Sequence, residues 1–469
     1  MKYTLTIQER HFSELKELIL KEDGFERPAI LLCGRSLISN DFWDGGPEYR
    51  FLSKEIIPIP DCDINSHSSI ALNFNTSTFR KAMKKAADED LAICLIHSHP
   101  ARANAFSLTD DKNERDCIET AYKRNGGDEP HLSMVITHDG TVFARAWTKQ
   151  LNFHEITMIR VIGDRFSFFY PGKYNNYNRE EFSRQQLAFG KTLNNDFAKL
   201  KIGVIGCGAT GSATAHLLAR LGVGYLLLID NDLVERSNLS RLYGATGVDA
   251  DAGRAKAEVL KDFIANIGIG CRVRAINDWV GSEKCRDAIK SCDIIFGCTD
   301  DNSGRIFLNR FAHFYLTPII DMGIEIEPSL DGSPQLQALQ GRVTILIPGN
   351  TCLLCRGTIN RQLAREENLK RNDPLGFDRQ KEEAYVTGGG NPSPAVITFT
   401  TEVATMAANE LINRITGFKK TPPDKHFMRF FDQGVDRRPG GKPVEGCPVC
   451  GSATYWGKGD IAPFMDQTN

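Results

Sequence analysis

Short apolar runs alternate with amphipathic stretches through the second half of the chain. The clearest unit spans residues 201–241, where apolar runs at 202–205 and 225–229 flank a helical pattern that ends at Gly222 and Gly224. Further strand-like and helix-like segments follow in alternation, at residues 271–278, 282–291, 292–300, 303–316 and 318–326. This alternation predicts a mostly parallel sheet with helices on both faces.

The first third of the chain has a mixed pattern of strands and helices. Residues 77–90 form an amphipathic helical pattern that begins at a capping hydroxyl, and residues 109–123 are also helix-like. Strand-like apolar runs lie at residues 30–34, 51–59, 91–96, 141–147 and 156–163. We therefore expect a separate α/β unit in this part of the chain.

Length and composition indicate two domains. A chain of 469 residues is too long for one ordinary hydrophobic core. Residues 169–182 are rich in Tyr, Asn, Gly and Pro, which are typical of a linker. We expect a first domain at residues 1–165, a linker at 166–180 and a second domain at 181–469.

The charge and the cysteine pattern exclude several classes of protein. A net charge of −2 favours no nucleic-acid partner, and no apolar run approaches the roughly 20 residues of a membrane span. The N-terminus is polar where a signal peptide would be apolar. The 13 cysteines are scattered except for two C-x-x-C pairs, which is typical of a reducing compartment with metal-bound thiols. We expect a cytoplasmic protein.

A glycine-rich turn follows the first strand of the second domain. Gly206, Gly208 and Gly211 allow a tight turn and a close approach of the backbone to phosphates, and the helix start offers free N–H groups. Asp230 ends the next strand, where a carboxylate can accept hydrogen bonds from ribose hydroxyls. The pattern predicts a nucleotide site, and by itself it is also typical of an NAD(P)-binding oxidoreductase.

Polar side chains after Asp230 distinguish an oxidoreductase from an enzyme that cleaves ATP between its α- and β-phosphates. Asp232, Asn238, Arg241 and Lys256 follow within one short stretch. Hydride transfer needs no such set of side chains, whereas cleavage between the α- and β-phosphates does, because charge builds on the leaving pyrophosphate. The sequence therefore favours an adenylyltransferase.

Residues 178–451 resemble the ThiF/MoeB and ubiquitin-activating adenylyltransferases. The motifs YNREEFSRQQLAFG, GCGATGS, IDNDLVERSNLSR, GRAKA and CTDDNSGRIFLN appear in the family's order. The resemblance implies that Asp230 holds the ribose and that Asn238, Arg241 and Lys256 hold the phosphates of ATP. It further implies that Asp300 acts through magnesium, although its neighbour Asp301 could exchange roles with it.

The same resemblance includes the segment YNREEFSRQQLAFG, which precedes the first strand of this domain. It implies that Arg184 reaches the phosphates from the partner subunit of a dimer, so we expect a homodimer.

A second group of chemically active residues follows the strand at residues 91–96. His97 and His99 alternate in the sequence, so on an extended backbone both imidazoles point to the same side, and Asp110 follows after a loop. Two imidazoles and one carboxylate leave zinc one open position for water, which is the composition of a catalytic site.

The pattern H-x-H-P-x6-S-x-x-D from His97 to Asp110 resembles the JAMM (JAB/MPN) metalloproteases. These deubiquitinase-like enzymes cut peptide or isopeptide bonds after the carboxyl terminus of a ubiquitin-like protein. The resemblance implies that His97, His99 and Asp110 bind zinc and that Ser107 hydrogen-bonds the oxyanion. It implies Glu26 as the general acid and base, with Glu55 as the substitute.

Two C-x-x-C pairs place four thiols in the second domain. Cys352, Cys355, Cys447 and Cys450 can complete a closed tetrahedral zinc site, which is structural because no coordination position is left open. A redox role for either pair is the alternative.

The segment between these pairs is expected to contact a substrate. Residues 361–384 are highly charged and resemble a crossover that covers the tail of a protein substrate. Where conjugating relatives carry a thioester-forming cysteine, this chain has Val386 and Thr387. Either the reaction ends at the acyl-adenylate or a cysteine elsewhere serves. We expect Cys298 to be packed at a strand end.

Together these patterns predict a bifunctional enzyme with ATP, magnesium and two zinc ions, one catalytic and one structural. It would trim a ubiquitin-like protein to its C-terminal glycine and activate that carboxylate with ATP, for protein tagging or for sulfur transfer. Its partners would be this protein and a conjugating enzyme or a sulfur acceptor. The alternatives are an NAD(P)-binding oxidoreductase and a scaffold with one inactive domain.

Overall fold

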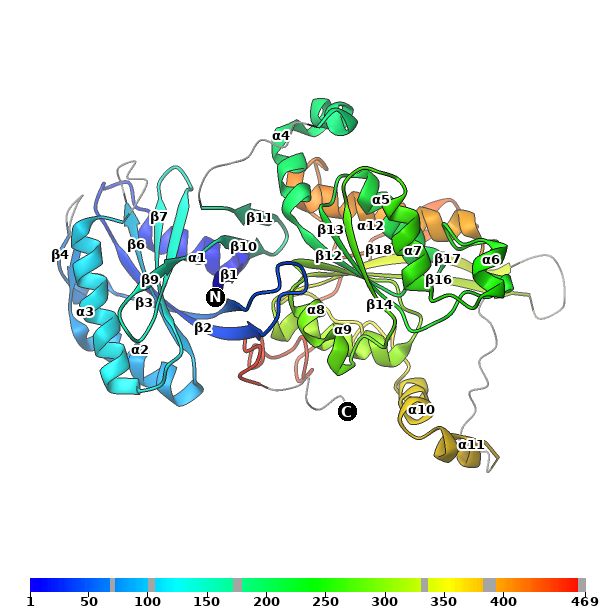
Figure 1. Cartoon of the computed structure of the whole chain (residues 1–469). Helices are drawn as coiled ribbons and strands as arrows, with labels where there is room; N and C mark the ends of the chain where they lie inside the picture. The colour runs from blue at the N-terminus through cyan, green and yellow to red at the C-terminus, as the bar shows by residue number, and fades with distance from the viewer. Residues whose placement is uncertain (68–71, 100–105, 172–178, 330–335, 383–393, 463–469) are drawn as a thin grey trace. The chain divides into compact units, whose positions relative to one another are not determined.

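The chain forms two compact units, seen in a computed structural model (Figure 1). The structure describes residues 1–67, 72–99, 106–171, 179–329, 336–382 and 394–462. The first unit contains residues 1–171, 314–316 and 455–462, and the second contains the other described residues.

The first unit is built on a nine-stranded mixed sheet with the order β11-β10-β1-β3-β2-β6-β7-β8-β9. The strands are β1 (Lys2–Gln8), β2 (Pro28–Ile38), β3 (Glu48–Pro58), β6 (Ala92–His99), β7 (His131–Thr137), β8 (Val142–Trp147), β9 (Phe153–Glu155), β10 (Met158–Ile162) and β11 (Phe166–Phe169). β4 (Ile64–His67) and β5 (Leu72–Phe74) pair in a separate two-stranded antiparallel sheet. The helices are α1 (Glu9–Ile19), α2 (Thr76–Glu89) and α3 (Leu108–Asn125), with a 3-10 turn η1 (Asp61–Asp63).

Helices cover both faces of this sheet. Side chains of β2 alternate between two cores, since Leu31 packs in the core of α1 while Ile30 packs in the core of α2 and α3. A strand that is buried on both faces has to be apolar at successive positions. This explains why the central strands appear in the sequence as continuous apolar runs.

Residues 455–462 also belong to the first unit, although the sequence analysis places them in the domain 181–469. The N–H of Asp460 donates to the carbonyl of Arg35 on β2 (2.8 Å), and Gly459 forms a β-bridge with Arg35. A Cβ at Gly34 would lie 2.0 Å from the carbonyl oxygen of Gly457, so the close approach requires glycine there. This segment could not be assigned from local patterns, because its partner strand lies more than 400 residues earlier in the chain.

His131 makes the stability of the first unit depend on pH. The N–H of Ile93 donates to Nδ1 of the ring (3.3 Å), and burial lowers the pKa of His131 to about 4. The unfolded chain takes up a proton near pH 6.5, so stability is lost as the pH falls from about 6.5 towards 4. The loss amounts to roughly 3 kcal/mol. We expect His131→Gln to show a weaker dependence of the unfolding free energy on pH in urea titrations.

The exposed His138 provides the control for this experiment. His138→Gln should keep the pH dependence of the wild type. Equal pH profiles for His131→Gln and the wild type would contradict this assignment.

The second unit has an eight-stranded sheet with the order β14-β13-β12-β15-β16-β17-β18-β19. Its strands are β12 (Lys201–Ile205), β13 (Tyr225–Ile229), β14 (Arg272–Ile276), β15 (Ile294–Gly297), β16 (Ile319–Pro328), β17 (Leu336–Leu346), β18 (His426–Phe430) and β19 (Val435–Arg437). The first five strands are parallel, as the alternation predicts. From β16 onward the pairing is antiparallel, because the gap between residues 328 and 336 is too short for the crossover that a parallel strand needs.

Helices lie on both faces of this second sheet. Figure 1 shows α5, α7 and α12 on one face and α8 and α9 on the other. The helices are α4 (Ser183–Lys199), α5 (Ala209–Arg220), α6 (Gly247–Asp251), α7 (Lys256–Ala265), α8 (Arg286–Lys290), α9 (Asn302–Phe314), α10 (Arg361–Asn372), α11 (Pro374–Glu382) and α12 (Ile397–Thr416). Short 3-10 turns are η2 (Glu180–Phe182), η3 (Arg236–Asn238) and η4 (Glu283–Cys285). None of the helices in the described ranges combines the length and apolar character that crossing a membrane requires.

Candidate functional site

Three candidate zinc ligands meet at the end of β6. Nε2 of His97 lies 3.1 Å from Nε2 of His99, and each of these atoms lies 3.3 Å from a carboxylate oxygen of Asp110. A zinc ion with bonds of about 2.0 Å holds tetrahedral ligand atoms about 3.3 Å apart. The three side chains therefore fit one zinc ion and leave its fourth position open.

The first turn of α3 fixes Asp110 in this place. Oγ of Ser107 accepts the N–H of Asp110 (3.1 Å), and Oδ2 of Asp110 accepts the N–H of Ser107 (2.6 Å). Burial alone would raise the pKa of Asp110, but hydrogen bonds from His97 and His99 outweigh it and hold this pKa well below its usual range. Because the Ser107 hydroxyl acts as an acceptor, its own hydrogen is available to donate.

Strand pairing brings Glu26 to the histidines. β2 and β6 pair Pro28 with His97, and the same register places Glu26 opposite His99. Oε1 of Glu26 lies 3.9 Å from Nε2 of His99, and burial raises the pKa of Glu26 although both histidines oppose the shift. Glu55 is instead bonded to Lys85 on α2 (2.7 Å). Of the two glutamates considered from the sequence, the structure brings only Glu26 to the histidines.

The sequence analysis missed a third carboxylate beside this cluster. Glu114 lies one turn after Asp110 on α3 and is 5% exposed. Its Oε1 is 3.8 Å from Nδ1 of His97, and Arg145 on β8 holds its other oxygen. The i, i+4 spacing from Asp110 was the available signal, since it places both carboxylates on one face of the helix.

The glycine turn of the second unit lies between β12 and α5. A Cβ at Gly206 would lie 2.8 Å from the backbone of Cys298, and one at Gly211 would lie 1.8 Å from the carbonyl oxygen of Gly206. Gly208, the N-cap of α5, has open space around it. Two of these glycines therefore serve packing, whereas Gly208 leaves the backbone accessible to a ligand.

Asp230 follows β13 and closes one side of the turn. Its carboxylate accepts the N–H groups of Cys207 (2.5 Å) and Asp232 (2.7 Å). Burial raises the pKa of Asp230, although the charge of Lys256 opposes the shift. The group is thus positioned by the backbone beside the glycines.

Lys256 is the first residue of α7 and points toward the acidic residues. Its Nζ donates to Asp232 (2.8 Å), and its side chain is largely buried. Burial disfavours the charge, but Asp232, Asp230 and Asp300 outweigh it and raise the pKa of Lys256. Residues from three separate segments therefore form one cluster at the carboxyl ends of the strands.

Asn238 and Arg241 lie close by in the chain, around η3. Oδ1 of Asn238 accepts the N–H of Glu235 (3.1 Å), and Nη1 of Arg241 donates to the carbonyl of Ser237 (2.6 Å). These local hydrogen bonds hold both side chains in the turn that leads from β13 to α7.

Asp300 and Asp301 differ in their environment. Asp300 is exposed, whereas Asp301 accepts the N–H groups of Ser303 (2.9 Å) and Gly304 (3.0 Å) at the start of α9 and Nε1–H of Trp279 (2.9 Å). Asp301 is thus occupied as a helix cap. Asp300 is the carboxylate that is available to a ligand.

The charged crossover contacts this same helix start. Glu367 of α10 accepts the N–H groups of Asn302 (3.2 Å) and Ser303 (2.8 Å), and Arg371 donates to Oγ of Ser303 (2.8 Å). The part of the crossover that the structure describes is therefore helical and packs beside Asp301.

Arg184 lies in the first turn of α4. The backbone of Gly190 has φ of 77°, which interrupts the helix, and Figure 1 shows the first part of α4 standing away from the sheet. Arg184 is exposed and makes no hydrogen bond or ion pair with any residue that the structure describes. The structure does not bring it to the nucleotide residues of its own chain.

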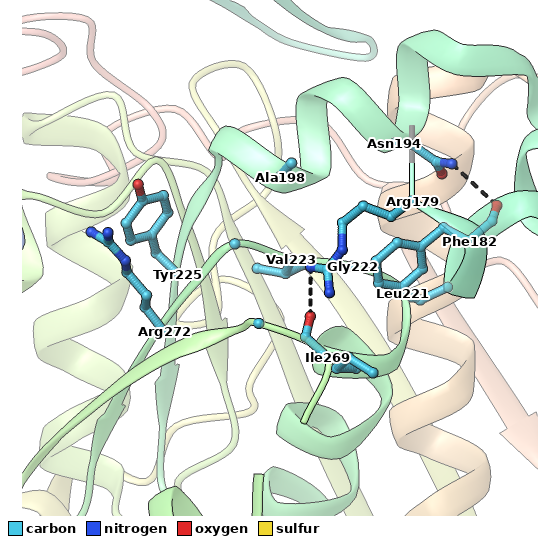
Figure 2. Close-up of a pocket in the computed structure, with 12 residues that line it drawn as sticks. Arg179, Phe182, Asn194, Ala198, Leu221, Gly222, Val223, Tyr225, Ile269 and Arg272 are labelled. Atoms are coloured by element: carbon cyan, nitrogen blue, oxygen red, sulfur yellow. Dashed lines mark hydrogen bonds between the residues drawn. The ribbon is translucent and has the colours of Figure 1, made fainter. Parts of the chain in front are cut away.

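The segment that leads into α4 is anchored in a cavity of about 110 Å³ (Figure 2). Nη1 of Arg179 donates to the carbonyl of Ile269 (2.8 Å), and the ring of Phe182 packs against Gly222. The cavity lies at the amino ends of β13 and β14, opposite the edge that carries the glycine turn. These contacts fix the position from which α4 begins.

A family model for the ThiF family matches residues 182–449, which is more than half of the chain. The chain belongs to the ThiF family. An oxidoreductase, the other activity typical of the glycine motif, is therefore not supported for this domain.

Individual relatives match parts of this ThiF chain. It is 27% identical to the SAMP-activating enzyme E1 of Haloferax volcanii over 33% of this chain and 52% of that enzyme. It is 26% identical to the sulfur carrier protein ThiS adenylyltransferase of Escherichia coli over 53% of this chain and 85% of that protein. A crystal structure of E. coli MccB with ATP covers 59% of this chain and 76% of that chain, with 19% identity and a TM-score of 0.45. The chain thus spans about half the length of the first of these relatives.

The four paired cysteines of the ThiF domain converge. Sγ of Cys352 lies 3.8 Å from that of Cys447, and Sγ of Cys355 lies 3.7 Å from that of Cys450. Zinc with Zn–S bonds of about 2.3 Å spaces tetrahedral sulfurs about 3.8 Å apart. The four thiols fit a closed structural zinc site.

Cys298, like Cys207 of the glycine turn, lies near the nucleotide residues and outside the cluster of four thiols. Cys298 lies between β15 and Asp300, and burial raises the pKa of its thiol. A thiol of this kind is a poor nucleophile at neutral pH. Val386 and Thr387 lie outside the described residues.

Proposed function

We propose that this chain is a bifunctional enzyme that trims a small ubiquitin-like or sulfur-carrier protein and activates its C-terminal glycine with ATP. One observation supports the proposal: each of the two units contains its own cluster of reactive side chains. The first has the cluster of His97, His99 and Asp110, and the second has the glycine turn with Asp230 and Lys256.

In the activation step, the substrate carboxylate attacks the α-phosphorus of ATP and pyrophosphate leaves. Asp230 would hold the ribose, while Asn238, Arg241 and Lys256 would face the phosphates and stabilise the charge that develops on them. Magnesium, held through Asp300, would neutralise part of the phosphate charge. The names of the relatives support this reaction, since two of them are an E1 activating enzyme and an adenylyltransferase for a sulfur carrier protein.

In the trimming step, the chain's own residues would position the substrate and move protons. Zinc, when bound, would supply a nucleophile from water near neutral pH. Glu26 would take a proton and return it to the leaving amine, because it lies beside His99 and burial raises its pKa. Ser107 would donate its hydroxyl hydrogen to the developing oxyanion.

Two further features complete the proposal. The α10 segment would close over the carboxyl-terminal tail of the substrate, since it packs at the start of α9 beside Asp301. Arg184 would reach the nucleotide of a second subunit in a homodimer, which agrees with its exposed position and with the interrupted helix that carries it.

ATP/pyrophosphate exchange tests the proposal directly. We expect exchange that depends on magnesium and on a small carrier protein ending in glycine, and cleavage of the same carrier when residues are appended after that glycine. A panel of ubiquitin-like and sulfur-carrier proteins with and without the terminal glycine provides the matched control. Absence of exchange with every member of the panel would refute the activation step.

A further inference from the structure

Glu114 is a buried carboxylate with one oxygen that makes no hydrogen bond to any residue the structure describes. Its Oε2 accepts from Nε (3.0 Å) and Nη2 (2.7 Å) of Arg145. Its Oε1 is buried and has no hydrogen-bond partner among the described residues, and it lies 3.8 Å from Nδ1 of His97. A buried, unpartnered carboxylate oxygen is costly and calls for a physical reason.

The two nitrogens of His97 face different groups. Nε2 lies within 3.3 Å of both His99 and Asp110, where the metal would bind, while Nδ1 faces Glu114. An imidazole that binds a metal through Nε2 carries its hydrogen on Nδ1, and the acceptor of that hydrogen selects the tautomer and the ring orientation.

We propose that Glu114 is a positioning residue that accepts the Nδ1–H of His97 and so keeps Nε2 unprotonated and aimed at the metal. The inference rests on the proposed metallopeptidase function of the first unit. His97, Asp110 and Glu114 all line one cavity of about 60 Å³.

The ion pair with Arg145 does not by itself explain why Glu114 lies beside His97. Arg145 also forms an ion pair with Asp111 (2.5 Å), and its guanidinium lies 3.9 Å from the ring centre of Phe106 and 4.5 Å from that of Phe153. Arg145 thus has other partners and uses one of the two oxygens of Glu114. The second oxygen is left for His97.

His99 differs from His97 in this respect. Its Nδ1 is buried without a hydrogen-bond partner among the described residues. The carboxylate support therefore acts on one of the two imidazoles, and removing it should weaken metal binding without abolishing it.

Glu114→Gln tests the proposal with little change in shape. The amide oxygen can still accept from Arg145, and the amide NH2 then faces Nδ1 of His97. A donor at that point favours the tautomer with hydrogen on Nε2, which cannot bind zinc through that atom. We expect the zinc affinity of this site to fall about 10- to 100-fold, measured by competition with a chelator in the full chain.

Three controls make the result interpretable. Glu119→Gln on the exposed side of α3, where Glu119 pairs with Lys123, should leave zinc affinity unchanged. Cobalt substitution separates the two sites, because the four thiolates give strong charge-transfer absorption that the histidine site lacks. Circular dichroism of the metal-free protein shows whether Glu114→Gln folds. If it does not fold, Glu114→Asp replaces it; this variant keeps a hydrogen-bond acceptor and should lose only part of the zinc affinity.

The outcomes distinguish this inference from the proposed function. If the wild type binds a second zinc and Glu114→Gln binds it equally tightly, only the role of Glu114 is overturned. Where Glu114→Asp is the only variant that folds, equally tight binding by that variant leads to the same conclusion. A wild type that binds zinc only at the four cysteines would overturn both proposals.

Discussion

Replacing Lys256 with alanine should lower the rate of ATP/pyrophosphate exchange by about 100- to 1,000-fold, the cost of losing one preorganised charge at a developing anion. The ammonium group is held by Asp232 at 2.8 Å, and three carboxylates raise its pKa, so it carries its full charge at neutral pH. The loss should fall mainly on the rate constant, because charge accumulates on the pyrophosphate in the transition state.

Lys261→Ala is the matched control for this prediction. Lys261 lies in the second turn of the same helix, and its ammonium group pairs with Glu258. We expect it to keep the exchange rate of the wild type. Normal exchange by Lys256→Ala would contradict the assignment of α7 to the phosphate site.

Replacing Glu26 with glutamine should strongly reduce cleavage while zinc binding and exchange remain. The side chain is 5% exposed and lies beside His99, and glutamine keeps its shape but cannot carry a proton between substrate and leaving group. Loss of a general acid and base lowers such rates by about 100- to 10,000-fold. The measurements are the cleavage rate of an extended carrier protein, the zinc content and the exchange rate on the same sample.

Glu55→Gln distinguishes the two glutamates that the sequence offered. Glu55 pairs with Lys85, so this variant should cleave at nearly the rate of the wild type. Cleavage that survives in Glu26→Gln and disappears in Glu55→Gln would reverse the assignment. Loss of exchange together with cleavage in Glu26→Gln would show that the two sites do not act separately.

Some features of the two candidate sites could be predicted from the sequence, and others could not. The glycine turn and the H-x-H pair could be recognised directly from the sequence, because the residues of each motif lie in a single strand or in the turn that follows it. The antiparallel part of the second sheet was not predicted, since no strand after β16 was identified from the sequence. Glu114 was also missed, because its position beside His97 depends on a strand and a helix that meet only in the folded unit.

The sequence by itself determined which chemical groups are available and how they are spaced along short stretches. It supplied two imidazoles on one side of a strand, glycines where the backbone must turn, and two thiol pairs. Only the tertiary structure decided which distant groups meet: the pairing of β2 with β6 places Glu26 at His99, and folding brings Cys352 within 3.8 Å of Cys447. The reason is that local patterns fix side-chain direction within an element, whereas strand register and packing fix distances between elements.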